Sequence, residues 1–171
     1  MLGLGNKVEI QMGTLSKAVG ASGGYISGIK SLIDLLISRA RTFIFTTAPM
    51  PSAAAAAIAG IGLIRGQEGK ALRQTLWKRV EEFSSELGLK KWPSAIIPIM
   101  IGEEARALGK AAELREQGVL IPAVRYPTVA HGQARLRVTV SAAHSTEDLR
   151  RVARLLRDTP THLVADEVTR L

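Results

Sequence analysis

The sequence predicts an α/β chain that ends in a small α+β domain. Apolar residues recur at helical spacing in several segments, most clearly over residues 70–87. Segments rich in β-branched residues lie between them, and RLRVTVS at 135–141 alternates apolar and polar residues as a half-buried strand does. From residue 95 onward the predicted order is strand, helix, strand, strand, helix, which is typical of a layered α+β structure.

The N-terminal elements surround a glycine-rich segment. Residues 8–12 and 24–27 predict two short strands on either side of a turn. Residues 31–39 predict a mostly buried helix, because five of them are leucine or isoleucine. Residues 42–46 (TFIFT) are β-branched and aromatic and predict a third strand.

Two helices follow the APMP segment. Ser52 is the predicted N-cap of an alanine-rich helix that runs to about Ile64, and RGQEG interrupts it. Residues 70–87 then predict an amphipathic helix that Gly88 ends. Its apolar stripe consists of Leu72, Leu76, Val80, Phe83 and Leu87.

The C-terminal domain begins with a strand at 95–101, in which Pro98 indicates an edge position or a bulge. Residues 103–117 predict a helix that Gly118 ends. Its inward side chains are Ala107, Leu108, Ala111 and Leu114.

The last elements are a strand at 119–124, the alternating strand at 135–141 and a final helix that Ser145 caps. The buried face of this last helix is predicted to contain Leu149, Val152, Ala153 and Leu156.

The composition limits the class of protein. With 46% apolar and 22% charged residues, the chain is globular rather than disordered. It has no cysteine, which excludes disulfides and thiolate metal sites and indicates a reducing, cytoplasmic compartment. The most apolar run, residues 53–64, is shorter than the roughly 20 residues that span a bilayer, so no membrane segment is expected. No metal site is expected either.

The net charge of +8 raises the possibility of a nucleic acid or phosphorylated ligand. The basic residues are spread over predicted helices, where a solvated face explains them. Only three Phe, two Tyr and two Trp are present, which leaves little for base stacking, so nucleic-acid binding is disfavoured.

Lys17 stands out within QMGTLSKAVGASGGYISG at residues 11–28. A lysine among small residues at the end of a strand can form a Schiff base with an aldehyde, of which pyridoxal 5'-phosphate is the usual one. The phosphate would need donors, such as the hydroxyls of Thr14 and Ser16 and backbone amides beside glycines. A surface lysine in a glycine-rich turn explains the same spacing, and the spacing alone favours it.

Two other phosphate-binding motifs fit the sequence poorly. The pattern GxxxxGK[ST] is absent. Gly60 and Gly62 lie in a helix-like stretch rather than after a strand, so they do not form a dinucleotide fingerprint.

Three segments together carry a family resemblance. GTLSKAVGASGGYISG, RARTFIFTTAPMP and IPAVRYPTVAHGQARLRVTVSAAHS occur in the order and at the spacing of the α-oxoamine synthases, which the chain resembles up to about Leu156. These are pyridoxal-phosphate enzymes of fold type I that join an amino acid to an acyl thioester with loss of carbon dioxide. The resemblance implies a partial cofactor-binding large domain over residues 1–64 and a small α+β domain over residues 65–171.

The resemblance also implies roles for individual residues. Lys17 is similar to the lysine that binds the cofactor and later takes the substrate α-proton, and Thr14 is similar to a phosphate ligand. Thr46 and Thr47 match a pair that reaches the phosphate of a neighbouring subunit, which implies a homodimer.

Arg125 and Thr128, within VRYPTV, match the substrate-binding segment of the family. A guanidinium suits a carboxylate because it offers two parallel donors, although a surface arginine after a strand is the plain alternative. His131 and His144 are assigned no catalytic role, since the first is expected in a loop and the second at a strand–helix boundary.

VRYPTV is most similar to the members that join L-alanine to a pimeloyl thioester, carried by coenzyme A or a carrier protein. GQARLR is also similar to the members that join glycine to an acetyl thioester. Family members are longer and carry an aspartate and a histidine for the cofactor ring upstream of the segment that Met1 begins here. The chain is therefore expected to be a C-terminal part that is inactive alone, and a non-catalytic interaction domain is the alternative.

Overall fold

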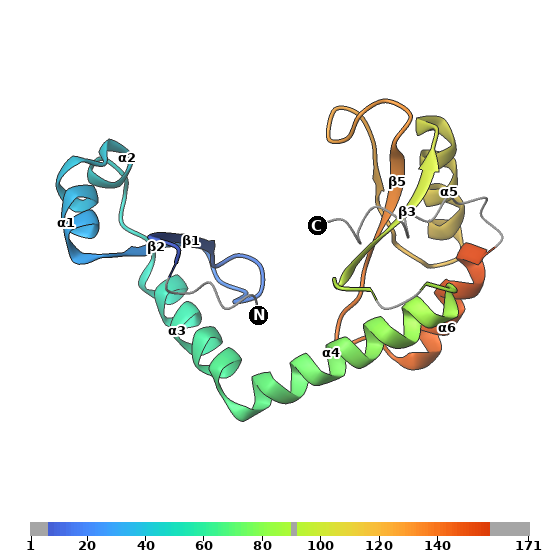
Figure 1. Cartoon of the computed structure of the whole chain (residues 1–171), viewed down its shortest axis with the longest axis horizontal. Helices are drawn as coiled ribbons and strands as arrows, with labels where there is room; N and C mark the ends of the chain where they lie inside the picture. Colours follow the sequence, from blue (N-terminus) through green and yellow to red (C-terminus); the bar gives the residue numbers. More distant parts are fainter. Residues whose placement is uncertain (1–6, 90–91, 158–171) are drawn as a thin grey trace. The chain divides into compact units, whose positions relative to one another are not determined.

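The computed structural model describes residues 7–89 and 92–157 (Figure 1). The chain forms two units, Met1–Lys70 and Ala71–Leu171. In the first unit, β1 (Ile10–Thr14) and β2 (Gly24–Gly28) form an antiparallel hairpin that pairs Thr14 with Gly24. The two strands predicted around the glycine-rich turn are confirmed, with β1 two residues later than predicted.

Three helices complete the first unit: α1 (Lys30–Arg39), α2 (Arg41–Ile44) and α3 (Pro51–Arg65). The prediction that the first of them is mostly buried is wrong, because α1 contains no buried residue. Its side chains Ile33, Leu36 and Ile37 instead line an open cavity of about 590 Å³, together with residues of the hairpin and of α2. The hairpin and short helices of this unit do not cover the apolar side of α1.

The strand predicted at residues 42–46 is wrong, since α2 occupies this position. The backbone amides of Phe43 and Ile44 both donate to the Ala40 carbonyl, each at 2.9 Å. Within the described residues no strand pairs with this segment. Aromatic and β-branched residues favour a strand only where a neighbouring strand is available, and α2 lacks one.

The predicted start of the alanine-rich helix is also corrected. Met50 is the N-cap of α3, without a side-chain hydrogen bond, and Pro51 is its first helical residue. Proline suits this position because its fixed φ is helical and the amide it lacks would have no partner there. Ser52 is therefore inside the helix rather than its cap.

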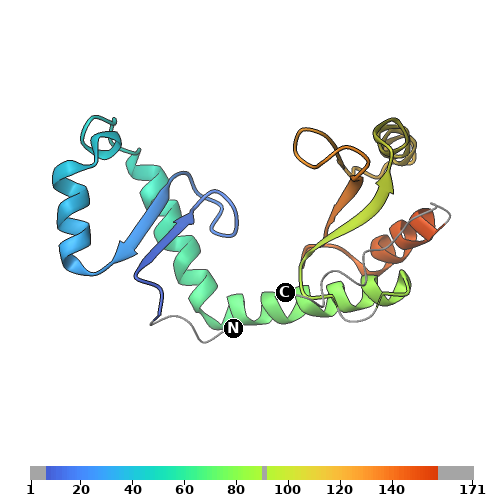
Figure 2. The same ribbon diagram turned by 45° about the horizontal axis from the view of Figure 1, so that its top comes forward.

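The second unit contains most of the long helix α4 (Gln67–Glu86). This helix begins three residues before its predicted start at residue 70, so the predicted interruption is limited to Gly66. The chain then forms β3 (Ile96–Gly102), α5 (Glu104–Glu116), β4 (Ala123–Val124), β5 (Ala134–Thr139) and α6 (Thr146–Arg157). The strands form an antiparallel sheet in the order β3-β5-β4. Figure 2 shows α6 beside α4. The predicted order from residue 95 onward, strand, helix, strand, strand, helix, is confirmed.

β3 lies at an edge of this sheet, and its pairing with β5 is irregular between Met100 and Gly102. Pro98 itself pairs in register with Arg137, so the predicted edge position is confirmed and the irregularity lies beyond this residue. The strand predicted at 119–124 is confirmed only for Ala123–Val124. Pro122 has no amide hydrogen to donate to a neighbouring strand, and its carbonyl accepts a hydrogen bond from the Arg137 amide at 3.0 Å.

The hydrophobic core of the second unit joins the sheet to α4, α5 and α6. Ile97 pairs with Val138 and Ile99 with Leu136, and all four side chains are buried. The helices contribute Val80, Phe83, Leu114, Leu149, Ala153 and Leu156. Alternation along β5 therefore places its apolar side chains in the core, as predicted.

Two of the predicted inward side chains are exposed. Leu72 is 45% exposed and Leu108 is 48% exposed. Leu72 lies in the first half of α4, which extends beyond the residues that pack on the sheet, and Leu108 lies one position after the buried Ala107. The helices were thus predicted correctly, while the extent of their buried faces was not.

Polar contacts join α6 to α4. Ser145 caps α6 as predicted, because its hydroxyl accepts the Asp148 amide hydrogen at 3.0 Å. Glu82 accepts hydrogen bonds from Arg79 at 2.9 Å and from Thr146 at 3.2 Å. The hydrogen bond from Arg79 lowers the pKa of Glu82 below its ordinary value, against the smaller opposing effect of desolvation.

Within the described residues, no helix is both long and apolar enough to cross a membrane.

The packing of α4 predicts contrasting effects for two of its apolar residues. Phe83 is fully buried, so Phe83→Ala should lower the free energy of unfolding by about 3–5 kcal/mol. Leu72→Ala should change it by no more than about 0.5 kcal/mol, because Leu72 is exposed. Urea unfolding of both variants measures the difference, and equal losses would contradict this packing.

Candidate active site

The Lys17 loop, residues 15–23, connects β1 to β2. Its ends are closed by a hydrogen bond from the Leu15 amide to the Gly23 carbonyl at 2.9 Å. Inside the loop, the Gly20 amide donates to the Lys17 carbonyl at 3.1 Å, which forms a tight turn. Gly20 has φ +69° and Gly23 has φ +111°, a region that favours glycine. These two glycines allow the loop to turn back so soon after Lys17.

The Thr14 hydroxyl organises the start of the Lys17 loop. Its Oγ1 lies 2.9 Å from the Ser16 Oγ and accepts a hydrogen bond from the Ser16 amide at 3.3 Å. Thr14 Oγ1 also lies 3.5 Å from the Gly23 carbonyl oxygen, to which it donates. The structure thus brings together two hydroxyls that the sequence singled out, directly before Lys17.

These residues fit a ligand that carries a phosphate and an aldehyde. Thr14 and Ser16 are exposed. The Ser16 hydroxyl can donate to a phosphate oxygen, and the Thr14 hydroxyl can do so in exchange for its hydrogen bond to the Gly23 carbonyl. Lys17 is exposed, and within the described residues no carboxylate pairs with its amine. An amine beside hydroxyl donors can bind the aldehyde and the phosphate of pyridoxal phosphate.

Thr46 and Thr47 lie between α2 and α3, and both are exposed. In the part of the chain that the structure describes, neither hydroxyl makes a hydrogen bond with the protein. Both can therefore donate to a partner or ligand. The structure gives no hydrogen bond that joins them to the Lys17 loop.

The second unit brings Arg125 and Thr128 together in a turn after β4. The Thr128 amide donates to the Arg125 carbonyl at 2.9 Å. The Arg125 guanidinium donates through Nη1 to the Tyr126 carbonyl at 3.2 Å, which leaves its other donors for a ligand. Both side chains line an open pocket of about 400 Å³, whose remaining lining residues are Pro122, Ala123, Val124, Tyr126, Pro127 and Arg137.

Arg137 was not predicted as a site residue, yet it lines the same pocket as Arg125 and Thr128. It is exposed on β5, where it alternates with the buried Leu136 and Val138. In the described part of the chain no carboxylate pairs with Arg125 or Arg137. Alternation in RLRVTVS could have identified Arg137 as outward-facing, but its proximity to Arg125 depends on the pairing of β5 with β4.

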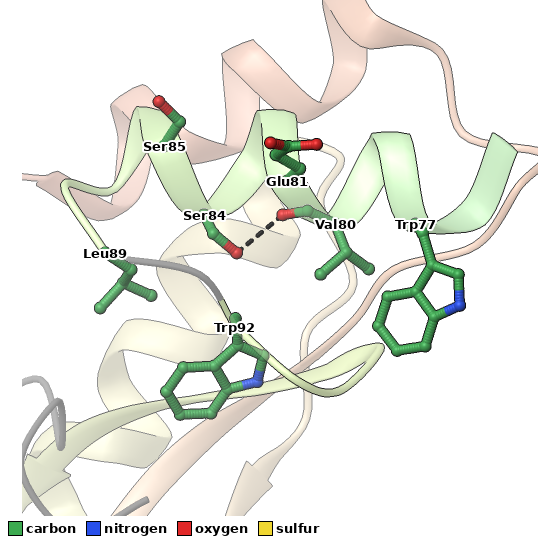
Figure 3. Close-up of a pocket in the computed structure, with 7 residues that line it drawn as sticks. All are labelled: Trp77, Val80, Glu81, Ser84, Ser85, Leu89 and Trp92. Atoms are coloured by element: carbon green, nitrogen blue, oxygen red, sulfur yellow. Dashed lines mark hydrogen bonds between the residues drawn. The ribbon is translucent and has the colours of Figure 1, made fainter. Parts of the chain in front are cut away.

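Another pocket of the second unit, of about 590 Å³, contains none of the predicted site residues (Figure 3). It is lined by Trp77, Val80, Glu81, Ser84, Ser85, Leu89 and Trp92. The buried Ser84 hydroxyl donates to the Val80 carbonyl at 2.7 Å, so it has a partner within α4.

Among the described residues no cluster of three or more His, Cys, Asp or Glu could hold a metal ion.

The candidate residues therefore form two groups, one in each unit. Thr14, Ser16 and Lys17 form the first, and Arg125, Thr128 and Arg137 form the second. The first group offers an amine and phosphate donors, and the second offers two guanidinium groups beside a hydroxyl.

Comparison with known proteins identifies the class to which this fold belongs. Residues 1–156 match the family described as aminotransferase class I and II, so the chain belongs to that family. A serine palmitoyltransferase from Sphingomonas wittichii matches with a TM-score of 0.82 and 27% identity, over 92% of this chain and 41% of that chain. The expected fold class, the C-terminal part of a fold type I transferase, is confirmed.

The curated relatives with similar sequences are named as one kind of enzyme. The 8-amino-7-oxononanoate synthase of Maricaulis maris is 45% identical over 148 residues, and that of Herminiimonas arsenicoxydans is 46% identical over 148 residues. The alignments cover 86% and 84% of this chain but only 37% and 38% of those relatives. The 8-amino-7-oxononanoate synthase of Francisella tularensis shares the fold, with a TM-score of 0.73 over 86% of this chain and 44% of that chain.

The geometry at Thr14 predicts that its hydroxyl keeps the Lys17 loop ordered. Thr14→Val removes the acceptor of the Ser16 amide, so exchange of that amide hydrogen with solvent should become about threefold faster. Thr14→Ser keeps the hydroxyl and should behave as the wild type. Amide hydrogen exchange followed by NMR measures both, and an unchanged rate in Thr14→Val would contradict this role.

Proposed function

We propose that the chain is the C-terminal part of an 8-amino-7-oxononanoate synthase, an acyltransferase of biotin biosynthesis. This enzyme joins L-alanine to a pimeloyl thioester, releasing carbon dioxide and the thiol, either coenzyme A or a carrier protein. The observation that carries the proposal is the 45% identity to the Maricaulis maris synthase, over a region that includes most of this chain. The grouping of Thr14, Ser16 and Lys17 supports it.

The proposed cofactor is pyridoxal 5'-phosphate. When bound, it supplies an aldehyde that reacts with amines and a conjugated ring that withdraws electrons from the substrate α-carbon. Lys17 would hold it through Nζ, and the Ser16 and Thr14 hydroxyls would donate to its phosphate, with Thr14 exchanging its hydrogen bond to the Gly23 carbonyl for one to the phosphate. The Lys17 amine would also accept the proton from the substrate α-carbon, which requires the amine in its neutral form.

The proposed carboxylate site is the pocket of the second unit. Arg125 and Arg137 each carry a permanent positive charge, and Thr128 adds a hydroxyl donor. Two guanidinium groups without a carboxylate partner among the described residues attract an anion and can orient it through parallel hydrogen bonds. These residues would hold the carboxylate of L-alanine and so orient its α-carbon.

The proposal extends to assembly and location. Thr46 and Thr47 would reach the cofactor phosphate of a second subunit in a homodimer, which their exposed hydroxyls permit. Residues 1–64 would belong to the cofactor-binding domain and residues 65–171 to the small domain. We place the enzyme in the cytoplasm.

Two alternatives from the sequence differ in substrate or in activity. A glycine C-acetyltransferase would use the same Lys17 with glycine and an acetyl thioester, which the GQARLR segment (residues 132–137) suggested. A non-catalytic interaction domain would retain the fold without using Lys17. The names of the curated relatives support the synthase over both.

The proposal predicts selective attachment of the cofactor to Lys17. The 171-residue chain, incubated with pyridoxal phosphate and reduced with borohydride, should carry the phosphopyridoxyl group on Lys17. Lys17→Arg should lose this label, because a guanidinium does not form the adduct. Mass spectrometry of the digested protein locates the label.

The matched control is Lys30→Arg, since Lys30 is an exposed lysine of the same unit that pairs with Asp34 at 2.6 Å. This variant should keep the label on Lys17. Label spread evenly over the lysines, or label retained in Lys17→Arg at the wild-type level, would count against the proposed function.

A further inference from the structure

The pocket residues Arg125 and Thr128 belong to the Arg125 loop, residues 125–133, which connects β4 to β5. The loop makes two turns of its own. In the first, the Thr128 amide donates to the Arg125 carbonyl at 2.9 Å. In the second, the Gln133 amide donates to the Ala130 carbonyl at 3.1 Å. These local hydrogen bonds shape the loop but do not fix it to the rest of the unit.

Two aromatic side chains join the two turns. The rings of Tyr126 and His131 are stacked, with their centroids 4.0 Å apart and their planes at 14°. Tyr126 directly follows Arg125, and its carbonyl accepts the hydrogen bond from the Arg125 guanidinium. The stack therefore connects the second turn to the residue that positions Arg125.

His131 also connects the Arg125 loop to α5. Its Nδ1 lies 2.8 Å from Oε1 of Glu104, the first residue of that helix. With the proton on Nδ1 the imidazole donates to the carboxylate, and in the cationic ring the contact becomes an ion pair. α5 itself is held by the core through Ala107 and Leu114. Glu104 is thus an anchor on a fixed helix.

The base of the Arg125 loop lies close to the end of β3. A Cβ placed on Gly102 would lie 3.5 Å from the Gly132 carbonyl oxygen, next in sequence to His131. Gly102 has φ +87° and Gly132 has φ +74°. The close approach of these two turns brings His131 within reach of Glu104 at the start of α5.

We propose that Glu104, His131 and Tyr126 are positioning residues that hold the Arg125 loop, and with it Arg125 and Thr128, in the orientation that binds the substrate carboxylate. This inference rests on the proposed function. Glu104 fixes His131, the ring of His131 fixes that of Tyr126, and the Tyr126 backbone fixes the Arg125 guanidinium. Neither His131 nor Glu104 lines the carboxylate pocket, so both act through the loop.

The first test measures amide hydrogen exchange of the Arg125 loop by NMR in the full chain. Glu104→Ala should make the Thr128 and Gln133 amides exchange about threefold faster, the effect expected from losing an exposed pair. Glu104→Gln should restore wild-type exchange, because its amide oxygen still accepts from Nδ1. Glu113→Ala is the control, since Glu113 lies on the same helix and pairs with Lys110 at 2.8 Å.

The second test titrates the same proteins with L-alanine and follows the Thr128 amide signal. Glu104→Ala should require about threefold more L-alanine for half-saturation, whereas Glu104→Gln and Glu113→Ala should titrate as the wild type. Unchanged exchange in Glu104→Ala, or exchange that accelerates equally in Glu113→Ala, would overturn the proposal. Faster exchange with unchanged L-alanine binding would also overturn it.

The two proposals fail differently. A wild-type chain that shows no saturable response to L-alanine counts against the proposed function, because the carboxylate site would then be absent. The exchange rates still decide whether Glu104 holds the Arg125 loop.

Discussion

The pairing of β5 with both of its neighbours is the constraint on which the second unit depends. β5 is the central strand, with β3 on one side and β4 on the other. Its inward side chains, Leu136 and Val138, enter the core, while Arg137 faces outward beside the turn that carries Arg125. A shift of one residue would expose the apolar side chains and bury the arginines, so the core fixes the register that forms the pocket.

In the first unit, local hydrogen bonds rather than a packed core order the candidate residues. The Lys17 loop is held by hydrogen bonds of its own backbone and by the Thr14 hydroxyl. The unit buries few side chains, and Ala57 is the one buried apolar residue of α3. Apolar side chains of α1 and of the hairpin line an open cavity. Local hydrogen bonds thus order the Lys17 loop, whereas a packed core orders the pocket that Arg125 and Arg137 line.

The sequence predicted the elements whose signal is local. Ser145 caps α6, and Pro98 lies on an edge strand, because capping and a missing amide act within a few residues. TFIFT was misjudged because its strand preference depends on a neighbouring strand that is not there. Arg137 was missed for the same reason: its partner in the pocket, Arg125, is brought to it by tertiary pairing. Thr14, Lys17, Arg125 and Thr128 came from motif resemblance, and their roles remain proposals.

The most direct measurement of the central claim uses a hybrid enzyme, in which this chain replaces the 148 aligned residues of the Maricaulis maris synthase. The measured quantity is 8-amino-7-oxononanoate formed from L-alanine and pimeloyl-CoA. The account predicts that the hybrid makes this product and that Lys17→Ala abolishes it. A folded hybrid that forms no product, or one that stays fully active with Lys17→Ala, would contradict the account.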